Sequence, residues 1–231
     1  MESTATDWVS ESRFGKWFQG TDTWYRYVLC EALADLRKLA GPDLPPLPRM
    51  LDVGCGQGMA FDLLHGHFGA RDITGVDIDP IMLRVARESA ARCPVPVTVK
   101  GGSVMRLDLA DESMDGVLCH QLIHHCANQV GALRELLRVL RPGGYLFLSE
   151  SCEAFINTWT VRWFFTHPPG VQQPAEGYLR LAREAGFRFD DARDVHTSTP
   201  WWSLPDFGIA RRLGLARRVS PPTELLLVAR K

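Results

Sequence analysis

Hydrophobic residues recur with two different periods along this chain, and the change of period divides it. Between residues 13 and 40 they recur every three to four positions, as in WYRYVLCEALADLRKLA, which is typical of a helix with one buried face. The segment GPDLPPLP at 41–48 carries four prolines, which remove backbone donors and end that helix. The pattern therefore predicts a helical N-terminal segment over residues 1–48.

From residue 49 onward, short apolar runs alternate with helical stretches. The predicted strands are 50–54, 73–77, 96–100, 115–121 and 145–150. The predicted helices between them are 59–67, 79–92 and 130–140. Asp79 and Pro80 supply an N-cap and a first-turn proline for the second of these helices. This alternation predicts an α/β fold in which helices cover both faces of a parallel sheet.

The last third of the chain is less regular. The pattern predicts one aromatic helix over 155–165 and a second helix over 175–185 that ends at Gly186. Strands are predicted at 187–196 and 225–229. Because the chain shows no internal repeat and is long enough for one hydrophobic core, residues 1–231 are predicted to form a single domain.

Composition narrows the class of protein. The 231 residues are 45% hydrophobic, and 26 basic against 27 acidic residues give a net charge of -1. No field of one sign is available to attract nucleic acid. The six cysteines form no C-x-x-C pair and no signal peptide precedes them, so we expect free thiols in a reducing cytoplasm. No apolar stretch approaches the ~20 residues that a transmembrane helix needs.

The aromatic residues are distributed unevenly. The chain has 7 Trp, 4 Tyr and 11 Phe, yet only four of them lie between residues 49 and 150, and none of those four is tryptophan. Aromatic side chains line apolar pockets and offer π faces to rings or cations. The flanks are therefore predicted to have a different function from the middle of the chain.

A glycine-rich loop, Asp52-Val53-Gly54-Cys55-Gly56-Gln57-Gly58, follows the first predicted strand. Glycines allow a ligand to approach the backbone, and the amides of the next helix then face it. Met59 occupies the position where a dinucleotide fingerprint has its third glycine. Asp52 would repel a pyrophosphate but would accept a hydrogen bond from an ammonium group, so the expected ligand is cationic or zwitterionic here. Asp77, which ends the second strand, is predicted to bind both ribose hydroxyls.

Four segments in this region together resemble the class I S-adenosylmethionine-dependent methyltransferases. LDVGCGQG is similar to the family's first motif and GVDIDPIML to the segment that follows it. DESMDGVLCHQLIHH resembles the fourth-strand segment, and LRVLRPGGYLFLSE resembles the late helix–turn–strand motif. The resemblance covers residues 49–150. It implies a Rossmann-like three-layer sandwich with a seven-stranded, mostly parallel sheet and an antiparallel C-terminal strand. It also implies S-adenosyl-L-methionine as cofactor and S-adenosyl-L-homocysteine as product.

The same resemblance implies roles for individual residues. The methionine portion of the cofactor is assigned to Asp52, Gly54, Cys55 and Gly56, the ribose to Asp77 and the adenine to Ile78. Where the family often has an acid that contacts the adenine amine, this chain has Ser103 and Val104, which are expected to bind the ring through a hydroxyl and an amide. A neutral hydroxyl is a weaker acceptor than a carboxylate, so this difference affects affinity. Cys119, at the end of the fourth strand, completes the predicted cofactor set.

Histidines cluster just past the fourth strand, at the sheet edge where open α/β folds bind ligands. His120 is the first candidate for a general base and His124 the second, because histidine titrates near neutrality. The alternative is that His124 and His125 only pack or cap the next helix. Because these two residues are adjacent and no carboxylate–histidine set has ligand spacing, no metal site is predicted.

Substrate specificity in this family usually resides outside the core. Residues 1–48 are therefore predicted to be a lid, 49–150 the cofactor-binding core, and 151–231 a substrate-side insertion with the C-terminal strands. The predicted substrate contacts are Trp17, Trp24, Trp159, Trp163 and His167. The alternative is a small second core that ties the flanks to the sheet. A basic interfacial helix around Arg211, Arg212, Arg217 and Arg218 would allow peripheral membrane contact, although a solvated helix face fits better.

The sequence therefore predicts a cytoplasmic enzyme that methylates an O, N or C atom of a small, largely apolar or aromatic metabolite, with no nucleic-acid partner. It does not indicate an oligomeric state. A nicotinamide-dependent oxidoreductase is a rival that Met59 and Asp52 disfavour. A cofactor-binding protein without turnover, acting through partners, is a rival of another class. A methyltransferase for protein or nucleic acid is weaker, because no basic patch is present.

Overall fold

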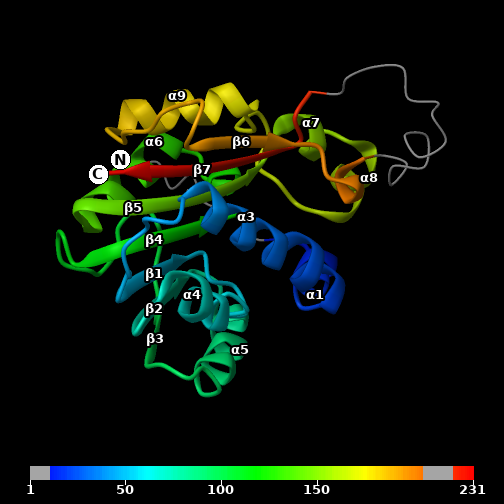
Figure 1. The fold of residues 1–231 in the computed structure, drawn as a ribbon. Helices are drawn as coiled ribbons and strands as arrows, with labels where there is room; N and C mark the ends of the chain where they lie inside the picture. The colour runs from blue at the N-terminus through cyan, green and yellow to red at the C-terminus, as the bar shows by residue number, and fades with distance from the viewer. Residues whose placement is uncertain (1–10, 205–220) are drawn as a thin grey trace, which may run out of the picture.

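A computed structural model describes residues 11–204 and 221–231. These residues form a three-layer α/β sandwich around a seven-stranded sheet of order β3-β2-β1-β4-β5-β7-β6 (Figure 1). The first five strands are parallel and β7 runs antiparallel between β5 and β6. This architecture confirms the predicted Rossmann-like fold, including its antiparallel C-terminal strand. No helix in the two described ranges is long and apolar enough to cross a membrane.

The strands are close to those that the hydrophobic pattern predicts. They are β1 Arg49–Val53, β2 Asp72–Asp77, β3 Val97–Gly101, β4 Met114–His120, β5 Leu140–Ser151, β6 Val195–Ser198 and β7 Glu224–Arg230. All seven residues of β4 are buried, as expected for a central strand covered on both faces. β1 pairs with β2 on one side and β4 on the other, so the chain reverses direction across the sheet at β1. Ligands of doubly wound folds bind beside such a reversal.

Helices cover both faces of the sheet. Those with buried faces are α3 Glu31–Leu39, α4 Phe61–Phe68, α5 Pro80–Ala90, α6 Gln129–Val139 and α9 Ala175–Ala185. One core cluster joins α3 and α4 to one face, and a second joins α6 and α9 to the other (Figure 1). The Asp79 side chain accepts from the Ile81 amide and Pro80 opens α5, as predicted. Gly186, with φ of 111°, ends α9 as predicted.

The predicted N-terminal helix is broken into several pieces. α1 covers Arg13–Gln19 and α2 covers Asp22–Trp24, and the break between them contains Gly20. A π-helix, η1 Tyr25–Cys30, then runs directly into α3. π-helical turns are frequent at functional sites, and this one follows Trp24, whose place is described below.

Two predictions in the last third need correction. The aromatic helix predicted over 155–165 is two short helices, α7 Glu153–Ile156 and α8 Trp159–Phe164. Thr158 between them is extended and its hydroxyl donates to the Phe155 carbonyl, so the backbone cannot continue as one helix.

The strand predicted over 187–196 is shorter and begins only at Val195. Before it, the Asp190 carboxylate accepts from the Ala192 and Arg193 amides and the Asp190 carbonyl accepts from the Asp194 amide. This turn uses the backbone groups that a longer strand would need for pairing. The arginine pairs at 211–212 and 217–218, and the membrane contact predicted for them, lie outside the described residues.

Candidate active site

The glycine loop leaves β1 at the point where the sheet reverses direction. Gly54, Gly56 and Gly58 have φ values of 71°, 51° and 73°, which side-chain-bearing residues rarely adopt. The Gly54 and Cys55 amides donate to the Val76 carbonyl, at 2.8 and 3.0 Å, which ties the loop to the end of β2. The loop is therefore a rigid backbone cradle built between two strands.

Asp52 lies beneath this loop, almost completely buried at 3% exposure. Within the described part of the chain, its Oδ2 has no hydrogen-bond partner. Burial, and secondarily the nearby Asp77, raise the pKa of Asp52 to about 7. An unpaired buried carboxyl is costly, and a cationic ligand beside it would remove that cost. Asp52 and the loop line one cavity, as the sequence predicts for a cationic ligand.

Asp77 projects into the same cavity from the end of β2. Its Oδ2 accepts from the Gly56 amide and its Oδ1 from the Asp79 amide, both at 2.8 Å. Burial raises its pKa, and these two hydrogen bonds oppose that effect. Each carboxylate oxygen keeps a further lone pair, so Asp77 can still accept from two hydroxyl groups.

A second cavity lies next to the first, beside the ends of β2 and β3. Gly54, Asp77 and Leu122 line both cavities. Ile78, Ser103 and Val104 line the second cavity, which brings these three predicted residues together. The Ser103 hydroxyl accepts from the Met105 amide at 3.2 Å, so its proton remains available to a ligand. The two adjacent cavities suit an elongated ligand with a polar and an apolar end.

His120 ends β4 and faces the first cavity. Neither of its ring nitrogens has a hydrogen-bond partner within the described ranges. Its ring lies edge-on to Trp24, with 5.6 Å between ring centroids. Burial, with a smaller effect from His124, lowers the pKa of His120 to about 3, so the ring is neutral at physiological pH. A neutral imidazole has one donor and one acceptor nitrogen, and within the described ranges neither is used by a protein group.

His124 is held differently. Its Nδ1 lies 2.6 Å from Oε2 of Glu150, which is fully buried at the end of β5. The other oxygen of Glu150 accepts from the Leu122 and Ile123 amides, at 3.0 and 2.7 Å. Glu150 therefore caps the short 3-10 helix η2, Ile123–His125, and fixes the His124 ring. His124 lines neither of the two cavities, whereas its neighbour His125 lines the first.

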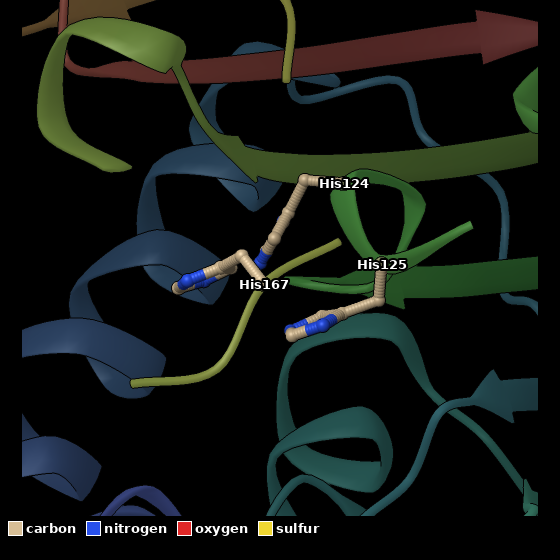
Figure 2. A group of neighbouring side chains, drawn as sticks. All are labelled: His124, His125 and His167. Carbon is tan, nitrogen blue, oxygen red and sulfur yellow. The ribbon is translucent and has the colours of Figure 1, made fainter. Parts of the chain in front are cut away.

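His167 approaches this pair from the segment after α8. Its ring stacks on His125 at 5.0 Å and lies 5.3 Å from His124, between ring centroids (Figure 2). Burial, and then His124, lower the pKa of His167 to about 3. The pKa of His125 is also well below its usual value, chiefly because of burial. Three histidine rings thus meet beside the first cavity.

The predicted substrate tryptophans do not share one location. Trp24 lines the first cavity. Trp17 and Trp159 are both 64% exposed and line none of the described cavities. Trp163 is 78% exposed and lines a separate surface cavity together with His167. Only Trp24 is therefore placed to contact a molecule beside His120.

Other aromatic residues connect the N-terminal segment to the α8 region. Phe14 lies 5.0 Å from Phe164 and 5.7 Å from Phe165, and Phe18 lies 5.9 Å from Phe165, between ring centroids. The Ser12 hydroxyl also donates to the Phe164 carbonyl at 2.6 Å. The two aromatic-rich flanks thus contact each other, although Phe14 and Phe164 remain 40% and 46% exposed.

Cys119 does not belong to the cavity lining. Successive strand residues face opposite sides, so Leu118 and His120 reach the first cavity while Cys119 is buried in the core beneath α6. Cys55 does line the first cavity, and burial raises the pKa of its thiol far above neutrality, so it is an uncharged contact.

Sequence reasoning missed several residues of the cavity. Lys16 of α1 pairs with Asp79 at 2.5 Å and its carbonyl accepts from the Gln57 side chain, which seats the N-terminal segment on the glycine loop. The apolar lining also comes from scattered positions: Leu29, Met59, Met82, Leu118 and Leu122. Glu150 had a usable signal, because an acid at the end of the apolar run YLFLSE is unusual in a buried strand.

Comparison with known proteins agrees with this geometry. Residues 51–148 match the family model described as a methyltransferase domain. Over these residues the chain is similar to a methyltransferase domain. Such a domain uses S-adenosylmethionine, and the unpartnered Asp52 oxygen, the glycine cradle and Asp77 fit its ammonium group, its backbone-contacting portion and its ribose.

The similar proteins include named O-methyltransferases. A ubiquinone biosynthesis O-methyltransferase of Xanthomonas oryzae is 38% identical over 104 residues, which are 44% of this chain and 42% of that protein. A malonyl-[acyl-carrier protein] O-methyltransferase of Methylococcus capsulatus is 34% identical over 146 residues, 63% of this chain and 51% of that protein. The chain thus spans about half the length of these curated relatives.

Solved structures share the methyltransferase domain's fold over more of the chain. An S-adenosylmethionine-dependent methyltransferase of Mesorhizobium loti has a TM-score of 0.64 at 21% identity, covering 87% of this chain and 98% of that one. The [4+2]-cyclase SpnF has a TM-score of 0.63 at 27% identity, covering 86% of this chain and 81% of that one. The same fold therefore supports different activities.

Proposed function

We propose that this protein transfers the methyl group of S-adenosylmethionine to an oxygen atom of a small, largely apolar or aromatic metabolite in the cytoplasm. The observation that carries the proposal is a single cavity that holds the unpaired Asp52 carboxyl, the glycine loop and His120. The choice of oxygen rests on the two O-methyltransferase relatives. Six cysteines, all free in the structure, support the location.

The two adjacent cavities suggest how the chain's residues would hold the cofactor. Asp52 and the Gly54–Gly56 backbone would bind the methionine portion, and Asp77 would accept from the ribose hydroxyls. Ile78 and Leu122 would enclose the adenine, with Ser103 and Val104 at its edge. Leu122 suits this position because it lines both cavities and would lie 3.0 Å from a side chain added at Gly54, so it closes over the loop.

The apolar side of the first cavity supports an apolar acceptor. Trp24 and Leu29 from the N-terminal segment meet Leu118 at the sheet edge, and methionines 59 and 82 complete the lining. Methionine side chains adapt to irregular ligands, and an indole face binds rings. Since Lys16 ties this segment to Asp79, acceptor and cofactor would be enclosed by the same N-terminal lid.

His120 is the residue that we assign to proton removal. S-adenosylmethionine supplies an electrophilic methyl group on a positively charged sulfur. His120 is neutral and its nitrogens lack partners, so it can accept the proton that an acceptor hydroxyl loses as its oxygen is methylated. The imidazolium that forms would lie in the same cavity as the Asp52 and Asp77 side chains.

A transfer assay tests the proposal directly. The protein is incubated with methyl-labelled S-adenosylmethionine and a panel of phenols, catechols and other hydroxylated apolar compounds, and labelled ether products are identified by mass spectrometry. We expect O-methylated products whose formation depends on Trp24, with Trp24→Ala raising KM at least tenfold. Exposed Trp159→Ala serves as the matched control and should leave KM unchanged. Transfer only to nitrogen or carbon acceptors would refute the choice of oxygen.

A second candidate function is a cofactor-binding protein that does not transfer methyl groups. The likeness to SpnF, whose name describes a cyclase, supports it. The two candidates differ in whether the methyl label leaves the cofactor. A protein of this second kind binds S-adenosylmethionine, and the label stays on the cofactor with every acceptor tested.

A further inference from the structure

Three histidines from two distant segments meet at one point of the fold. His124 and His125 lie on η2 after β4, and His167 lies 42 residues further along, after α8. One possible ligand nitrogen from each ring lies within 4.8 Å of those of the other two. In Figure 2, His167 comes from a different segment than His124 and His125, and its ring lies next to theirs. The cluster lies outside the cofactor contacts assigned above, apart from His125, which borders the first cavity.

Glu150 sets the chemical state of one of these rings. A carboxylate that already accepts from two amides accepts from His124 as well, so the His124 proton is on Nδ1. Nε2 of His124 then carries a lone pair. A buried carboxylate that holds one nitrogen of a histidine, leaving the other as a ligand, is the usual arrangement around a protein-bound metal ion.

The two segments are fixed relative to each other. The Gln129 side-chain amide, buried at 6% exposure, donates to the Ile123 carbonyl at 3.1 Å and to the Val171 carbonyl at 2.8 Å. On the other side of His167, the Thr166 amide donates to Glu11 at 2.9 Å. The convergence of the rings is therefore built by hydrogen bonds on both sides of the cluster, and the fold brings His167 to His125 before any ligand is added.

We propose that His124, His125 and His167 bind one divalent transition-metal ion of the Zn²⁺ class. Tetrahedral Zn²⁺ with Zn–N bonds of about 2.0–2.1 Å needs nitrogens about 3.4 Å apart, so the rings would approach by about 1.4 Å at most. Imidazole ligands suit Zn²⁺, Co²⁺, Ni²⁺ and Cu²⁺, whereas Mg²⁺ and Ca²⁺ require oxygen ligands.

Three protein ligands leave one position of a tetrahedral ion open. Because His125 also lines the cavity beside His120, this position would take water or an oxygen atom of a molecule bound there. The metal site itself does not rest on the proposed methyl transfer, since the histidine geometry exists without either substrate.

Metal titration tests the proposal. The full-length protein is freed of metal with a chelator and titrated with Co²⁺, followed by Zn²⁺, with neither S-adenosylmethionine nor acceptor present. We expect one ion per chain, visible absorption of tetrahedral Co²⁺ that Zn²⁺ removes, and a higher Tm with Zn²⁺. His167→Ala and His125→Asn should each weaken binding at least 100-fold, while exposed His196→Ala should not change it. Measurement of Tm before metal is added shows whether each variant is folded.

Glu150→Gln is a sharper variant, because a glutamine amide either donates to His124 Nδ1, which moves the ring proton to Nε2, or turns its NH₂ toward the Leu122 and Ile123 amides. We expect metal affinity to fall about 10- to 100-fold. Binding of less than one ion per chain, or affinity that is equal in the wild type and in both histidine variants, would overturn the proposal and show that the rings only pack against one another.

Discussion

Replacing Asp52 with Asn tests the idea that the buried Asp52 carboxyl destabilises the folded protein when it is ionised and no cation is bound. Asn has the same shape and cannot ionise. Asp52 is almost fully buried, its Oδ2 lacks a partner within residues 11–204 and 221–231, and burial raises its pKa from 3.8 to about 7. The folded protein therefore holds this proton more tightly than the unfolded chain does.

The sign and size of the effect follow from that difference. The stability that the protonated carboxyl contributes is fully present below pH 3.8 and is lost as the pH rises toward 7. The displacement from 3.8 to about 7 corresponds to about 4 kcal/mol. Asp52→Asn keeps a neutral group at every pH. The variant should thus equal the wild type near pH 4 and have a free energy of unfolding about 4 kcal/mol higher at pH 8.

Binding should change in the opposite direction. A charge-assisted hydrogen bond contributes about 1.5–3 kcal/mol, so Asp52→Asn should weaken S-adenosylmethionine binding about 10- to 100-fold at pH 8. Urea unfolding and calorimetric titration from pH 4 to pH 8 measure both quantities. Asp43→Asn, at an exposed loop position, is the control and should shift neither curve. Parallel stability curves for Asp52→Asn and the wild type would refute the reasoning, as would unchanged affinity.

Three further substitutions test other parts of the structure. His120→Asn should lower kcat at least 100-fold, while the affinity for S-adenosylmethionine stays within about threefold of the wild type. Because burial lowers the pKa of His120 to about 3, the wild type should lose stability as the pH falls from 6.5 toward 3, and the variant should lose less. A kcat equal to that of the wild type would remove His120 from the mechanism. Lys16→Met should cost about 1–2 kcal/mol in urea unfolding by leaving the buried Asp79 carboxylate without its cation, whereas Lys38→Met, which breaks an exposed pair with Asp35, should have no measurable effect. Gly186→Ala should lower the free energy of unfolding by about 1–2 kcal/mol in the same assay, because φ is 111° and the new methyl would lie 2.9 Å from Leu137. Gly66→Ala, on α4 where a methyl would meet open space, should instead raise it by about 0.5–1 kcal/mol. A Gly66→Ala variant less stable than Gly186→Ala would contradict the backbone argument.

The fold could be predicted because its determinants are local. The runs around β1, β2 and β4 are apolar over the length of a buried strand, and α5 and α9 carry their own start and stop signals, Asp79 and Gly186. The predictions failed where a side chain diverted the backbone. Thr158 and Asp190 each form hydrogen bonds with nearby backbone groups, and hydrophobic periodicity does not reveal that competition.

The cofactor side of the site was also largely predictable, because its residues follow strand ends whose order the parallel sheet fixes. The acceptor side was not. Trp24 reaches the cavity while Trp17, seven residues earlier, faces solvent, and the break at Gly20 between them sets that difference. The histidine cluster was not predicted either, because long-range packing brings its members together. Adjacent His124 and His125 do not have ligand spacing, and His167 joins them only through a loop held by Gln129.

The charge states of the buried groups favour a cationic ligand over a neutral one. With a pKa of about 7 for Asp52 and about 3 for His120, both groups are neutral over most of the range from pH 3 to 7, so the free cavity avoids buried charge at these two positions. A cation placed at Asp52 reverses that balance, because it favours the ionised carboxylate and lowers its pKa. Binding below pH 7 would then release a proton from Asp52. A neutral ligand would leave Asp52 protonated, so the cavity is selective for charge before any contact with the acceptor is made.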